Sequence, residues 1–140
     1  MFNWFKKKKA PELEFIPLIE KLLNLQVASK NTNIRRLFST FMTNKQASGY
    51  IFGFHDSMLQ SIGLYNANNP ENAAYLIEAS YKNLFGSQAG YALFNTSLAN
   101  QNDSDFEKGV MHGGEDMYEY FNNQVPATGL SLILLYHRNA

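Results

Sequence analysis

The sequence contains no cysteine. That absence excludes disulfide bonds, thiolate catalysis and cysteine-ligated zinc or iron–sulfur sites, so any metal would need nitrogen or oxygen ligands. The chain also lacks an apolar run of the roughly 20 residues that a membrane-spanning helix requires. A P-loop, a G-x-G-x-x-G fingerprint and a G-x-S-x-G elbow are missing as well. The sequence is therefore that of a cysteine-free globular chain, and it contains no standard motif that identifies a reaction.

The first ten residues combine aromatic side chains with a lysine run, Lys6 to Lys9. A secretory signal places its charge before an apolar region, whereas here Phe2, Trp4 and Phe5 precede the charge and form too short an apolar part. We therefore expect a cytoplasmic protein in which residues 1–10 form a basic, aromatic tail. A solvated tail is the favoured interpretation, and contact between this tail and anionic lipid is the disfavoured alternative.

The net charge is zero, but the charges are unevenly distributed. Residues 1–45 hold nine Lys or Arg against three acids, and residues 46–140 hold three against nine. Much of the negative charge lies in 103–119, where six acids oppose only Lys108. Because contacts to phosphate require clustered Lys and Arg, the body of the fold is not expected to bind nucleic acid. An acidic surface instead favours a basic protein as partner.

Apolar residues recur at helical spacing along most of the chain. The spacing predicts an all-α single domain over 11–140. The expected helices cover about 12–29, 33–45, 47–64, 70–85, 88–100 and 104–122. The last apolar run, "LSLILLYH", is either a strand or a helix by periodicity alone.

Internal similarity predicts that a three-helix unit occurs twice. The segment "LFSTFMTN" at 37–44 resembles "LFNTSLAN" at 93–100, and a weaker pair joins 17–25 with 75–84. The sequence thus favours a bundle of six or seven helices with approximate internal duplication. Its halves would be about 11–66 and 70–122, and a helix at about 127–137 would begin a third copy.

Four glycines occupy equivalent helical positions in the two halves: Gly49 and Gly53 in the first, Gly109 and Gly113 in the second. Each costs about 1 kcal/mol of helix stability relative to alanine, so a compensating contact is expected. Residues spaced i, i+4 share one face, and a face without side chains lets another backbone approach closely. We expect these glycines to pack helices together, either with each other or with a neighbour. A groove left open for a ligand is the alternative.

Each glycine pair is followed by an aspartate, Asp56 or Asp116. The structural interpretation is a buried carboxylate that needs hydrogen-bond donors. A catalytic alternative makes Asp56 and Asp116 paired carboxylates, with His112 as a further candidate.

A metal site is another alternative, because His112, Glu115, Asp116 and Glu119 recur at helical spacing. His55, on the matching helix, could add a ligand, but its apolar neighbours favour a core histidine. No metal or other cofactor is expected in the favoured interpretation, since the usual two-helix metal motifs are absent.

The leading functional hypothesis is a non-enzymatic module that binds a basic protein. The predicted contact residues are Asp103, Asp105, Glu107, Glu115, Asp116, Tyr118 and Glu119. In size and charge layout the chain resembles the immunity proteins that neutralise bacterial toxins, and that resemblance implies a bacterial inhibitor whose partner is a toxin. A metal-assisted hydrolase or small-ligand site on the glycine-bearing helices is the alternative function. Self-association through exposed glycine faces is a third possibility.

Overall fold

A computed structural model describes residues 13–65 and 68–139, and this part of the chain is helical without strands. Its seven α-helices are α2 (Phe15–Val27), α3 (Phe38–Thr43), α4 (Lys45–Ser61), α5 (Pro70–Phe85), α6 (Ser87–Ala99), α7 (Ser104–Asn123) and α8 (Gly129–Asn139). The expected all-α single bundle is therefore confirmed. The predicted tail, residues 1–10, lies outside the described residues.

The last apolar run is a helix, as the repeat argument predicted and periodicity alone could not decide. The single helix expected at about 33–45 is wrong, because a short 3₁₀ turn at Arg35–Leu37 precedes α3. Asn44 then has an extended backbone, and its side chain accepts a hydrogen bond from the Ala47 amide. Asparagine caps helices in this way, so Asn44 ends α3 and begins α4.

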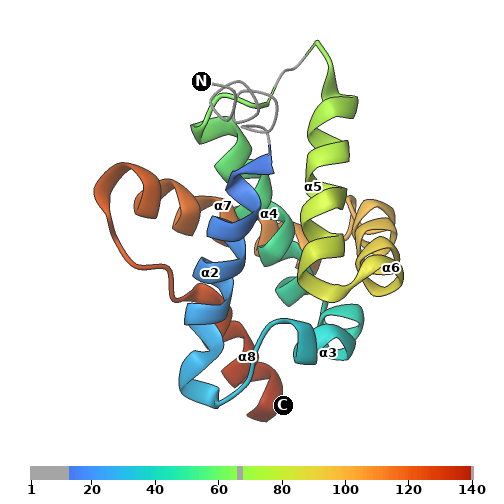
Figure 1. Ribbon diagram of the computed structural model, residues 1–140. Coiled ribbons are helices and arrows are strands. Elements are labelled where there is room, and N and C mark those ends of the chain that lie inside the picture. The colour runs from blue at the N-terminus through green and yellow to red at the C-terminus, as the bar shows by residue number, and fades with distance from the viewer. Residues whose placement is uncertain (1–12, 66–67, 140) are drawn as a thin grey trace.

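The core surrounds α4, which Figure 1 shows near the middle of the molecule between α2 and α7. α4 buries side chains on most of its circumference, whereas α7 buries a single stripe. The α5–α6 pair covers another side of the bundle (Figure 1). The largest fully buried side chains are Tyr50, Tyr81, Phe41, Phe54, Phe106, Ile19, Leu23, Ile34, Ile51, Met58, Leu59 and Leu76. No helix of the described residues has the length and hydropathy of a membrane span.

The four glycines lie where α4 and α7 contact each other, in the most extensive helix–helix contact of the described chain. A Cβ atom on Gly49 would overlap the carbonyl oxygen of Phe106, and one on Gly53 would overlap that of Val110. In the same way, a Cβ on Gly109 or Gly113 would overlap a carbonyl oxygen of α4. The two backbones therefore touch, and only glycine fits at these positions.

The contacts that α4 makes with α7 are equivalent to those that α7 makes with α4, when residues 60 positions apart are taken as counterparts. A shift of 60 residues converts the contact of Gly49 with Phe106 into that of Gly109 with Gln46. It likewise converts the contact of Gly53 with Val110 into that of Gly113 with Tyr50. Such exchange of equivalent partners is the pattern of a two-fold related interface. The predicted duplication of a three-helix unit stays a prediction.

The neighbouring glycines 113 and 114 provide a matched test of this packing. Gly113→Ala should lower the free energy of unfolding by at least about 2 kcal/mol, because the new methyl group forces the helices apart. Gly114→Ala should be neutral or stabilising by up to about 1 kcal/mol, since its Cβ would lie 3.8 Å from the nearest atom, Gly53 O. Urea unfolding of both variants measures the difference. Equal stability of the two would contradict the close packing.

Candidate functional site

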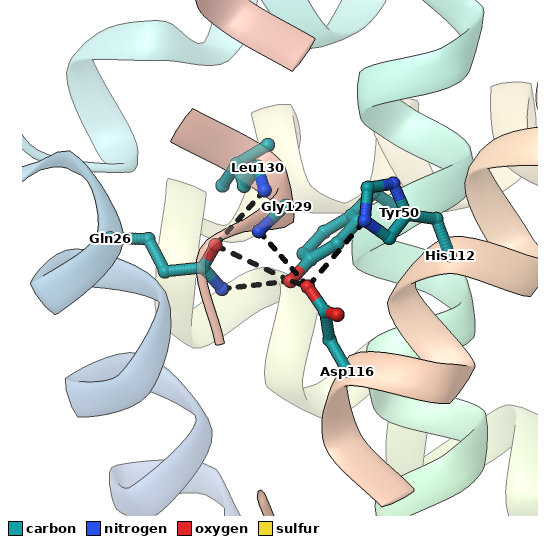
Figure 2. A network of polar contacts seen from close by, with 6 residues as sticks. All are labelled: Gln26, Tyr50, His112, Asp116, Gly129 and Leu130. Carbon is teal, nitrogen blue, oxygen red and sulfur yellow. Dashed lines mark hydrogen bonds and ion pairs between the residues drawn. The ribbon is translucent and has the colours of Figure 1, made fainter. Parts of the chain in front are cut away.

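Asp116 lies at the centre of a polar cluster that joins α2, α4, α7 and α8 (Figure 2). Its Oδ2 atom accepts a hydrogen bond from the Tyr50 hydroxyl at 2.6 Å and another from the Gly129 amide at 3.0 Å. His112 Nε2 lies 3.8 Å from the same oxygen. Asp116 thus receives donors from two other helices.

Gln26 completes the cluster from α2. Its side-chain nitrogen donates to Tyr50 Oη at 3.0 Å, and its Oε1 accepts from the Leu130 amide at 3.0 Å. The first amides of a helix have no partner within the helix, so Gln26 and Asp116 together cap the N-terminus of α8. Burial raises the pKa of Tyr50, and the hydrogen bond to Asp116 raises it further. Tyr50 therefore remains a neutral donor.

At the start of α8 the cluster lies so close to Gly129 that a side chain there would displace His112 or Asp116. A Cβ on Gly129 would lie 2.5 Å from His112 Nε2 and 2.6 Å from Asp116 Oδ2. His112 also contacts the edge of the Tyr50 ring, with 5.5 Å between ring centroids. Asp116 Oδ2 is therefore used within the fold, while the Asp116 side chain keeps 23% exposure, and its contact with a partner stays a prediction.

A groove of about 440 Å³ lies on a different face of the α4–α7 pair. From α4 it is lined by Gly53, Asp56, Ser57 and Gln60, and from α7 by Val110, Met111, Gly114, Glu115, Tyr118 and Glu119. Lysine and arginine are absent from this set of described residues. The three carboxylates, Asp56, Glu115 and Glu119, make this groove acidic.

Asp56 is half-buried in this groove. Burial raises its pKa, while a hydrogen bond from Gln60 at 2.9 Å lowers it. Gln60 is its one hydrogen-bond partner among the described residues. The carboxylate is thus partly removed from water and carries fewer donors than Asp116.

Apart from Asp116, the predicted partner residues lie in four different places. Glu115, Tyr118 and Glu119 line the groove, Glu107 is exposed on α7, and Asp105 lines a separate hollow with Lys45. Asp103 instead caps α7, accepting from the amides of Asp105 and Phe106 and pairing with Lys45 at 3.0 Å. The hydrogen bond from Lys45 is the main cause that lowers the Asp103 pKa.

His55 is a core residue, not a surface ligand. Its Nδ1 lies 2.8 Å from the Ile51 carbonyl oxygen, so that nitrogen donates, and Nε2 accepts from the Ser80 hydroxyl at 2.7 Å. Burial lowers the pKa of His55 to about 4. Both ring nitrogens are used, which leaves none for a metal.

The structure does not assemble the catalytic or metal alternatives. Asp56 and Asp116 belong to separate hydrogen-bond networks, so they do not form the supposed carboxylate pair. Among the described residues, no three His, Asp or Glu side chains are grouped to hold a metal ion. His112 and Asp116 point toward α8, whereas Glu115 and Glu119 line the groove. One residue rotates a helix position by about 100°, and this rotation separates Glu115 from Asp116.

No family model, curated protein or solved structure matches this chain. The groove and the polar cluster are therefore the features of this chain from which a function is inferred.

The two fully buried tyrosines test the polar cluster. Tyr50→Phe should lower the free energy of unfolding by about 2 kcal/mol, because the Asp116 carboxylate loses a donor. Tyr81→Phe should change it by less than about 0.5 kcal/mol, since the Tyr81 hydroxyl faces Ser97 without a hydrogen bond of ordinary geometry among the described residues. Chemical unfolding of both variants measures these changes. A larger loss for Tyr81→Phe than for Tyr50→Phe would contradict the assigned bonds.

Burial of neutral His55 predicts acid sensitivity. The folded pKa, about 4, lies below the ordinary value of 6.5, so the unfolded chain binds the proton first. The difference between the two pKa values contributes up to about 3 kcal/mol to the free energy of unfolding. This contribution is present above pH 6.5 and is lost as the pH falls toward 4. Unfolding measured across that range should show a smaller pH slope in a folded His55→Gln variant than in the wild type. The same slope in both proteins would contradict the prediction.

Proposed function

We propose that this protein is a non-enzymatic binding module that engages a basic protein through the groove and the adjoining outer face of α7. The observation that carries the proposal is the composition of this surface. Three carboxylates, Asp56, Glu115 and Glu119, line one groove without a compensating lysine or arginine. A partner that brings positive charge would complement it.

Exposed apolar side chains beside the carboxylates support protein binding. Met111 and Tyr118 line the same groove and are 66% and 57% exposed. Tyrosine presents a large contact area with few rotatable bonds, and methionine adapts its shape to a partner. Charged residues at the rim mainly speed association, while buried contacts of this kind supply affinity.

The favoured form of this function is an inhibitor that binds a basic toxin, the role of bacterial immunity proteins. Such a role requires a complementary surface and no reacting group. The polar cluster of Asp116 and His112 is compatible with this proposal, because its hydrogen bonds maintain the position of α8. The groove is open to a partner.

The partner can be captured with a photoreactive amino acid at position 118. We expect the cross-linked protein to be basic, and its affinity to fall at least tenfold for Glu115→Lys/Glu119→Lys. The loss follows because like charges replace complementary ones. Binding should also weaken with added salt. Circular dichroism and calorimetry of the variant establish that it remains folded.

A charge-matched control separates the groove from overall charge. Glu14→Lys/Glu71→Lys changes the net charge by the same amount at two exposed positions outside the groove. This variant should bind within about twofold of the wild type, because charges beyond the Debye length of about 8 Å are screened. Unchanged affinity of the groove variant, or equal losses in both variants, would contradict the proposed surface.

A further inference from the structure

Asp56 and Asp116 occupy equivalent places in the reciprocal α4–α7 contact. Each lies seven residues after the first glycine of its pair, and they are themselves 60 residues apart. The same shift of 60 residues relates the glycine contacts of the two helices. The groups that bind the Asp116 carboxylate therefore indicate which kind of group fits beside the Asp56 carboxylate.

Asp116 holds the N-terminus of a helix. Its Oδ2 accepts the Gly129 amide at 3.0 Å in the first turn of α8. The start of α8 is buried there, and a Cβ on Gly129 would displace the side chains of His112 and Asp116. The positive end of the helix dipole makes a carboxylate a favourable partner.

The equivalent place beside Asp56 is the open groove. Under the same 60-residue shift, Val110 has the position relative to Asp56 that Tyr50 has relative to Asp116. Gln60 corresponds in the same way to Tyr120. Asp56 accordingly lacks the tyrosine hydroxyl and the helix amide that Asp116 receives. No described helix begins in this groove, whose lining comes from α4 and α7 alone.

We infer that the groove receives the N-terminal turn of a helix of the basic partner, with Asp56 accepting a backbone amide as Asp116 accepts that of Gly129. This inference rests on the proposed function and specifies the partner's contact. Glu115 and Glu119 lie along the same groove, where they pair with Lys or Arg of the bound helix. Met111 and Tyr118 contact its apolar face.

A synthetic peptide tests this geometry without knowledge of the partner. The probe is an amphipathic helix of about 14 residues that begins Thr-Gly-Leu, as α8 does, and carries four arginines on its polar face. Its matched control carries N-methylglycine in place of the glycine, which removes the amide donor. Titration followed by amide resonances of the protein locates both peptides and gives both affinities.

The probe should shift the amides of Gly53, Ser57 and Gly114, which line the groove. Its affinity should fall at least fivefold with N-methylglycine and at least fivefold with Asp56→Asn. Glu71→Gln removes the same charge at an exposed position on α5, outside the groove, and should leave the affinity within twofold. The N-methyl peptide leaves the protein unchanged, so its result does not depend on how a variant folds.

The outcomes distinguish this inference from the proposed function. The probe could bind in the groove with an affinity that neither N-methylglycine nor Asp56→Asn changes. In that case the acidic surface is still supported as a binding surface, and the helix-terminus contact is wrong. Shifts confined to Gln26 and Tyr50 would place the probe at the site of α8 and would also overturn the inference. Absence of binding to the wild-type protein would overturn it as well, while the captured partner and the charge variants still test the proposed function separately.

Discussion

Direct backbone contact between α4 and α7 is the constraint on which the rest of the structure depends. Four glycines let the two helices approach until the carbonyl oxygens of one occupy the space of missing side chains on the other. Glycine weakens each helix in isolation, so the contact has to recover that stability through packing and burial. The contact also fixes the register of the helices, which in turn places Asp56 and Asp116 on different faces of the pair.

The two faces of the α4–α7 pair differ in what covers them. On one face α2 and α8 close over the pair, and Asp116 caps α8 while Tyr50 and Gln26 complete its hydrogen bonds. On the other face the equivalent aspartate lies in a groove with two further carboxylates. One geometry therefore provides both an internal anchor and an accessible acidic surface. This contrast, rather than the number of acids on α7, makes the groove the candidate for binding.

Much of the fold could be predicted because local patterns determine it. The helices followed from apolar spacing, and the importance of Gly49, Gly53, Gly109 and Gly113 followed from the stability that glycine forgoes in a helix. The break between the helices expected at about 33–45 and 47–64 was placed about two residues late, because the capping bond of Asn44 begins α4 at Lys45. Gly90 was missed because Gly86, four residues earlier, lies outside the helix expected at about 88–100, yet a Cβ on Gly90 would lie 2.6 Å from Lys82 Cα on α5.

The candidate site was predicted less well, because its partners are remote in sequence. Asp56 and Asp116 could be singled out by their equivalent spacing, but nothing in the sequence marks Gln26 or Gly129 as partners of one cluster. The acidic segment was treated as one surface, whereas the helix turns its residues toward a cap, a polar cluster and a groove. A helical projection separates Glu115 from Asp116, and only the packing decides which face is covered.

The bond between Gln26 and the Leu130 amide spans 104 residues. A chain that has not yet assembled α2, α4 and α7 offers α8 no surface on which its first amides are satisfied. Closing so long a loop has an entropic cost that the native contacts must offset together. Protection of the α8 amides from hydrogen exchange therefore reports whether the whole bundle has assembled, not whether a local helix has formed.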